Sequence, residues 1–126
     1  MKKNELANLW FAKGKEDLLY ARAVVNEVKI YGLLCFHCQQ AIEKFLKSYL
    51  TEIGVRFRKT HKLTELLSLC LKADKRFVIF KQEMINLDQY YVETRYPLDN
   101  PRLYTKQEAR EAIVVAEKVL KFIKSL

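Results

Sequence analysis

The sequence predicts an all-α fold, an antiparallel up-and-down helical bundle of four long helices plus one short helix. Apolar residues recur at steps of three and four positions over most of the chain. Only 3 Gly and 2 Pro occur among 126 residues, which leaves few turns for a β-rich fold. Half of the residues are hydrophobic, enough for one core, so we expect a single domain over residues 1–126.

The first two predicted helices are the longest. Residues 5–28 keep one apolar stripe, and the pattern then breaks before Gly32, the expected turn residue. Residues 33–53 have a wide apolar face. Gly54 follows that face, where a helix end favours a residue that accepts positive φ. Two long helices with a short connection should pack antiparallel.

The second half of the chain predicts three further helices. A basic connection over 55–60 precedes a short helix at about 62–73, and a fourth helix is expected at about 77–93. Both prolines lie in 95–104, which we expect to be a loop. The last helix begins at 105–108, Thr-Lys-Gln-Glu, which has the pattern of a capping box.

Charge and cysteine usage suggest the compartment and the kind of partner. The formal net charge of +8 favours an anionic partner, although a solvated Lys-rich surface explains it equally well. No secretory signal pattern follows Met1, and no apolar run approaches the length of a membrane span. We therefore expect a cytoplasmic protein with no membrane partner, whose 3 cysteines stay reduced.

Polar residues interrupt the apolar face of the second predicted helix. His37, Gln40 and Lys44 share one side of it with Ala41. Such groups are costly to bury without hydrogen-bond partners, and we expect the fourth helix to supply some of these partners. The polar groups could satisfy one another and fix the helix register, or they could hold a ligand.

The basic connection is a second candidate site. Guanidinium groups of Arg56 and Arg58 stand beside the hydroxyl of Thr60 and the imidazole of His61, a combination that suits a phosphate. A solvated surface loop with His61 as a helix anchor is the alternative.

Cys35 and Cys38 invite a metal or redox interpretation. Two further ligands would be needed, and only Cys70 and His61 are in reserve. Both cysteines fall inside a predicted helix, where small thiols pack well. We therefore predict no metal and no cofactor, and the chain has no Gly-rich phosphate loop.

Several strings, in this order, resemble the HEPN family, the "higher eukaryotes and prokaryotes nucleotide-binding" domain, over nearly the whole chain. The strings are Lys15-x-Asp17-Leu18, Phe36-His37-x-Gln39-Gln40-Ala41-x-Glu43-Lys44, Thr60-His61-x-Leu63 and Tyr91-x-x-Thr94-Arg95-Tyr96-Pro97.

The resemblance implies a helical bundle that forms homodimers. It also implies a minimal nucleotidyltransferase partner, in many cases as a toxin–antitoxin pair. Some members are metal-independent RNases with an Arg, four to six residues and a His late in the bundle. Here no His follows Arg95, whereas Arg56 and His61 have this spacing in the early loop.

Three functions remain open. The first is a nucleotide- or phosphate-binding module that dimerises and acts with a nucleotidyltransferase. The second is an RNase toxin in which Arg56 positions phosphate and His61 is the general acid or base. The third is an interaction subunit without a ligand. The predicted ligand-binding residues are His37, Gln40, Lys44, Arg58, Thr60, His61, Arg95 and Tyr96. Ligand binding requires the surroundings of Gln40 and His61 to lie together.

Overall fold

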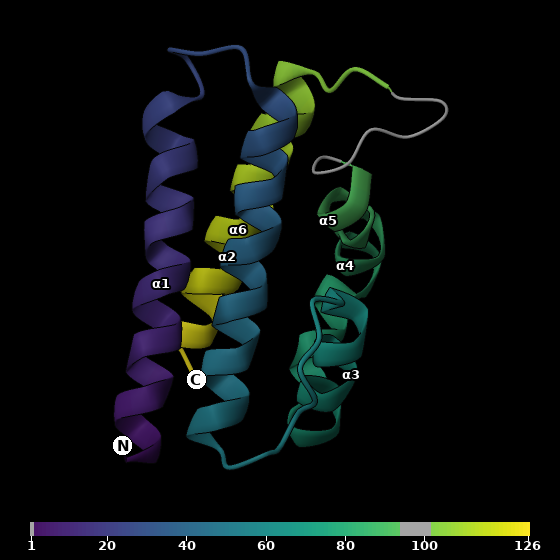
Figure 1. Ribbon diagram of the computed structural model, residues 1–126. Helices are drawn as coiled ribbons and strands as arrows, with labels where there is room; N and C mark the ends of the chain where they lie inside the picture. The colour runs from purple at the N-terminus through teal and green to yellow at the C-terminus, as the bar shows by residue number, and fades with distance from the viewer. Residues whose placement is uncertain (1, 94–101) are drawn as a thin grey trace.

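The computed structural model describes residues 2–93 and 102–126, and all regular structure within them is helical. The elements are α1 (Lys3–Val24), α2 (Tyr31–Glu52), α3 (Leu63–Ala73), the 3-10 helix η1 (Lys75–Phe80), α4 (Lys81–Asp88), α5 (Tyr90–Glu93) and α6 (Lys106–Lys124). In Figure 1, α1 and α2 run antiparallel, α6 lies behind them, and α3 and α4 flank the other side of α2. The predicted all-α up-and-down bundle is confirmed.

The core is organised around α2, which contacts α1, α3, α4, α5 and α6. Its apolar side chains Leu34, Ile42, Phe45 and Leu46 are fully buried. Gly54 follows α2 with a φ of 76°, the left-handed conformation predicted for it. No helix among residues 2–93 and 102–126 has the length and apolar character needed to cross a bilayer.

The expected fourth helix is not continuous. It begins with η1 and continues as α4 and α5, with a turn at Gln89 between them. Residues 77–80, Phe-Val-Ile-Phe, are aromatic or β-branched and have low helix propensity, which fits a short 3-10 turn at the start. Gly32 lies inside the first turn of α2 and not in the preceding turn, and a Cβ there would be 3.1 Å from the Tyr104 ring.

Side-chain caps fix two of the connections. Both oxygens of the Asp88 carboxylate, at the end of α4, accept hydrogen bonds from the first backbone N–H groups of α3, at Leu63 and Thr64. This contact positions the residues just before α3, including His61. The predicted capping box of α6 is present, because Thr105 and Glu108 bond reciprocally through side chain and backbone.

Gly14 allows α1 and α2 to approach closely. A methyl group there would lie 2.7 Å from Cε1 of Phe45 and 3.0 Å from the carbonyl oxygen of Ala41. A helix normally gains about 1 kcal/mol when Ala replaces Gly. We expect Gly14→Ala to reverse that gain and lower the free energy of unfolding by about 1–2 kcal/mol, because the fully buried Phe45 ring has little room to move and the Ala41 carbonyl oxygen cannot rotate away. Urea unfolding followed by circular dichroism measures the change.

The double variant Gly14→Ala/Phe45→Leu is the control for this close approach. A smaller ring-free side chain makes room for the methyl group, so the Gly14→Ala change should be less destabilising in the Phe45→Leu background. If Gly14→Ala raises stability in the wild-type background, the two helices are not in steric contact at this position.

Candidate functional site

One cluster of charged side chains joins α1 to α2. The Asp17 carboxylate lies 2.8 Å from Nδ1 of His37 and accepts a hydrogen bond from Nζ of Lys44 at 2.6 Å. Burial raises the pKa of Asp17, but the hydrogen bonds and positive charges of His37 and Lys44 outweigh it, so the pKa lies below its ordinary value of 3.8. Asp17 is therefore ionised at neutral pH and neutralises Lys44.

A second cluster lies one turn further along α2. Nδ1 of His61 is 3.0 Å from Oε1 of Glu43, and the other Glu43 oxygen accepts a hydrogen bond from Nζ of Lys47, also at 3.0 Å. Gln40 donates to the same Oε1 of Glu43 at 3.1 Å. Gln39 donates to the backbone carbonyl of His61 at 2.8 Å. Gln40 and His61 therefore meet at one carboxylate oxygen, as ligand binding requires.

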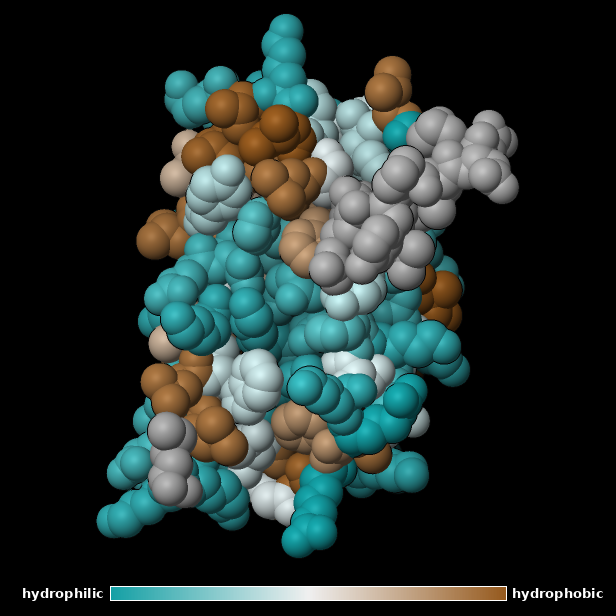
Figure 2. Space-filling view, in the orientation of Figure 1, coloured by the Kyte–Doolittle hydropathy of each residue, from teal (hydrophilic) through white to brown (hydrophobic). Residues whose placement is uncertain are grey.

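Aromatic rings pack around both imidazoles. The Tyr20 ring lies 5.0 Å from His37, and the Tyr91 ring stacks on His61 at 4.3 Å with an interplanar angle of 14°. Phe36 bridges the clusters, with ring centroids 5.8 Å from His37 and 6.0 Å from Tyr91. Figure 2 shows a mainly hydrophilic band across the middle of the face that α1 and α2 turn to the viewer. We call the two clusters and these rings the α1–α2 polar face.

The carboxylates lie behind the imidazoles in this face. The side chains of Asp17 and Glu43 are 14% and 4% exposed, whereas those of His37 and His61 are 27% and 47% exposed. A carboxylate only accepts hydrogen bonds, so each Nδ1 carries the shared proton. Among the described residues, neither Nε2 has a hydrogen-bond partner. Each imidazole can therefore offer Nε2 to a ligand as an acceptor when neutral or as a donor when protonated.

Within the part of the chain that the structure describes, the predicted residues of the connection over 55–60 are not hydrogen-bonded to either cluster. Arg58 donates from Nε and Nη2 to Glu65 on α3 and is largely exposed. Thr60 is buried, and its hydroxyl accepts from the backbone N–H of Lys62. Arg56 is exposed. The predictions for Arg95 and Tyr96 fall outside the described residues.

Sequence reasoning identified the imidazoles but not the carboxylates that orient them. We expected partners from the fourth helix, and Tyr91 of α5 does stack on His61. The acidic partners instead come from α1 and from α2 itself. Glu43 and Lys47 had the i,i+4 spacing of an ion pair, and that pair is present and buried. The sequence held one signal for Asp17, because this carboxylate falls within the otherwise apolar stripe of the first predicted helix.

The cysteines lie away from this chemistry. Cys35, Cys38 and Cys70 are free and buried in the core. Burial raises the pKa of the Cys35 and Cys70 thiols to about 12, and it raises that of Cys38 further. The nucleophilic and metal-binding form of cysteine is the thiolate, so these three side chains act as apolar packing groups at neutral pH.

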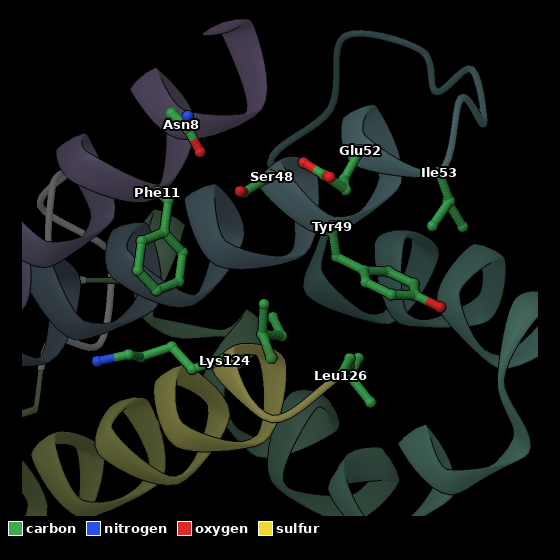
Figure 3. A pocket seen from close by; sticks show the side chains of 9 residues that line it. Asn8, Phe11, Ser48, Tyr49, Glu52, Ile53, Lys124 and Leu126 are labelled. Atoms are coloured by element: carbon green, nitrogen blue, oxygen red, sulfur yellow. The ribbon is translucent and has the colours of Figure 1, made fainter. Parts of the chain in front are cut away.

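A separate hollow of about 350 Å³ lies near the chain ends, between α1, α2 and α6. The Phe11 and Tyr49 rings border it, with Glu52 and Lys124 at its edge (Figure 3). None of its lining residues belongs to the predicted site. The described residues of the predicted site therefore lie outside this cavity.

Residues 7–126 match the family described as HEPN domain. The chain belongs to the HEPN family. A protein of Methanocaldococcus jannaschii named "Putative toxin MJ1304" is 31% identical over 132 residues, which cover 94% of this chain and 86% of that protein. The crystal structure of ST0689, an archaeal HEPN homologue, is similar with a TM-score of 0.78 and 28% identity, covering 99% of this chain and 98% of that one.

The ion pairs of this HEPN domain predict a pH-dependent contribution to stability. Asp17→Asn should lower the free energy of unfolding by about 1–3 kcal/mol at pH 7, because Lys44 and His37 lose a partly buried, charged partner. The folded pKa of Asp17 lies below 3.8, so its contribution is complete above that value and is lost as the pH falls through the folded pKa. The difference between the two proteins should therefore shrink below about pH 4.

Glu16→Gln is the matched control, since Glu16 forms an exposed pair with Lys13 on the same helix. Its effect on stability should stay within about 0.5 kcal/mol. Chemical unfolding at several pH values measures both variants. A difference between wild type and Asp17→Asn that grows on acidification would show that Asp17 is not held ionised by its partners.

Proposed function

We propose that this HEPN domain is the toxin-like member of a toxin–antitoxin pair. It dimerises, acts with a minimal nucleotidyltransferase partner, and binds a nucleotide or RNA through phosphate groups on the α1–α2 polar face. One observation supports this location of the binding site. Gln40 and His61 meet at the Glu43 carboxylate, beside the cluster that contains His37 and Lys44.

The charges of this face suit a phosphate-bearing ligand. Asp17 neutralises Lys44 and Glu43 neutralises Lys47, so the exposed imidazole edges become the polar groups that meet a ligand. The exposed cations Arg56, Lys59 and Lys62 flank His61 along the chain. With a net charge of +8, they favour approach of an anion from solution.

The proposed nucleotidyltransferase partner is inferred from the family and from one similar protein. The similar Methanocaldococcus jannaschii protein is named a toxin, and the alignment covers most of both chains. An antitoxin must recognise its toxin specifically, and members of this family commonly pair with a nucleotidyltransferase. We extend that pairing to this chain.

A second candidate is an interaction subunit that binds no small ligand. Among the described residues, every fully buried side-chain nitrogen or oxygen has a hydrogen-bond partner. A network satisfied in this way can fix the register of the helices without a ligand.

Binding of ATP, GTP and a short single-stranded RNA separates the two candidates. Fluorescence anisotropy should show binding that weakens as salt is added. For a single strand, the logarithm of the binding constant should fall linearly with the logarithm of the salt concentration, with a slope of about −0.7 for each phosphate contact. His61→Gln should weaken binding about tenfold or more, because it removes a donor to a charged group. Lys121 is an exposed residue of α6 outside the polar face, so Lys121→Gln is the control and should bind like wild type.

A flat titration for all three ligands would favour the ligand-free subunit. Equal weakening by His61→Gln and Lys121→Gln would mean that binding reflects overall charge and not this face.

Assembly is tested separately. Light scattering should give a mass near twice the 15.0 kDa of the chain at micromolar concentration. If a minimal nucleotidyltransferase is encoded beside the gene, co-expression with it should give one co-eluting complex. A monomer that elutes apart from the transferase would contradict the proposed assembly and would leave the binding result standing.

A further inference from the structure

We propose that a groove between α4 and α6 is a docking site for an amphipathic helix of another protein. The docked helix has an apolar face, acidic residues at one end and basic residues at the other. The groove shares no residue with the α1–α2 polar face, so the inference goes beyond the proposed function. It assigns a protein contact to α4 and α6 and states the chemistry of the segment that binds there.

Two helices border the groove without packing closely against each other. α6 packs on α2 and α1, whereas α4 packs mainly on α3. The rings of Phe80 and Phe122, with centroids 5.3 Å apart, close the floor at one end. Hollows of about 520 Å³ and about 270 Å³ lie between the two sides, and both are lined by Glu83. The two hollows therefore adjoin and form one groove.

A third hollow extends the groove over the solvent side of α6. It has a volume of about 380 Å³ and shares Glu111 and Val115 with the smaller hollow and Lys118 with the larger one. The lining residues of α6 run from Gln107 to Phe122, about 20 Å along the axis at the usual rise of a helix. A docked helix of about four turns would span this length.

Apolar side chains stay exposed along the groove. Val114 of α6 is 49% exposed, and Ile79 near the end of η1 is 63% exposed. Val115 and Phe122 are partly buried and pack against the core beneath them. Burial of such groups against a partner is favourable, because it removes apolar surface from water. Both sides of the groove therefore offer contacts to an apolar face.

The charge of the groove changes from one end to the other. Lys118 and Lys121 lie at the end near Phe122, and among the described residues neither of them forms an ion pair. Glu108 and Glu111 line the opposite end. A helix with acidic residues over the lysines and basic residues over the glutamates matches both ends, whereas a segment of one charge is repelled at one of them.

A helix suits this groove better than an extended segment. The groove is bordered by helices, whose backbone groups are bonded within each helix, so an extended segment would find no row of N–H and C=O partners. A docked helix satisfies its own backbone groups and needs only side-chain contacts. Its apolar residues at i, i+3, i+4 and i+7 would face the floor of the groove.

Binding of designed peptides to the full chain tests the proposal. The probe is a hydrocarbon-stapled helix of about 14 residues with leucines on one face, glutamates at one end and lysines at the other. At about 0.15 M salt, which screens long-range attraction, it should bind with a dissociation constant below about 1 mM. Nuclear magnetic resonance should show shifts of the amide signals of α4 and α6 and none in α1.

Two control peptides test the pattern of the docked helix. One has the same composition with its leucines spread around the helix, and the other has glutamates at both ends. Each should bind at least about fivefold more weakly than the mixed-charge peptide, because the first lacks a continuous apolar face and the second is repelled by Glu108 and Glu111.

Charge reversal on α6 provides the matched protein variants. Lys118→Glu/Lys121→Glu should weaken binding of the mixed-charge peptide about five- to tenfold and strengthen binding of a peptide with lysines at both ends. Lys72→Glu/Lys75→Glu makes the same change of net charge outside the groove and should leave both affinities within about twofold. All four lysines are exposed, so both double variants should fold like wild type, which circular dichroism checks.

Three results would overturn the inference. The first is a mixed-charge peptide that causes no shifts in α4 and α6. The second is equal weakening by the two double variants, which would mean that overall charge governs binding. The third is a dimer that Lys118→Glu/Lys121→Glu turns into a monomer in light scattering, because the groove would then hold a second copy of this chain. RNA should bind equally well with and without the peptide, so failure at one surface leaves the proposal for the other standing.

Discussion

Ionised carboxylates at the junction of α1 and α2 are the constraint on which this molecule depends. Moving a lone carboxylate out of water is expensive, and the penalty is relieved only by good geometry with a cation and further hydrogen bonds. Glu43 has such partners in Lys47, Gln40 and His61, and Asp17 has them in Lys44 and His37. Helix packing, loop position and imidazole orientation are thereby coupled. The register of α1 against α2 cannot shift without leaving at least one charge unpaired.

The same two carboxylates link the stability of the bundle to the candidate site, because each bonds both a lysine and an imidazole. Lys44 and Lys47 neutralise the two carboxylates. The two imidazoles, each more exposed than its carboxylate, bond the same groups. Lys47 is further enclosed by the rings of Trp10 and Phe57, which lie 5.2 and 5.8 Å from its ammonium.

Most of the fold was predictable from local signals. Periodicity located α1, α2, α3 and α6, and short-range chemistry at Gly54 and Thr105 was predicted correctly because it depends on a few adjacent residues. The segmentation of the fourth helix was missed, because its apolar period continues while the propensity of residues 77–80 opposes a regular helix. Polar positions on α2 were recognisable as exceptions to an apolar face. Their partner Asp17 was not, since a contact across 20 residues depends on how two helices pack.

The absence of a side chain at Gly14 has a consequence for the contact between Asp17 and His37. Asp17 lies three residues further along α1, and aspartate is too short to bridge a wider gap between the helices. The bare backbone at Gly14, pressed against Phe45 and Ala41, is therefore what brings a carboxylate within reach of His37. The geometry of this polar contact therefore depends on a residue one turn away that has no functional group at all.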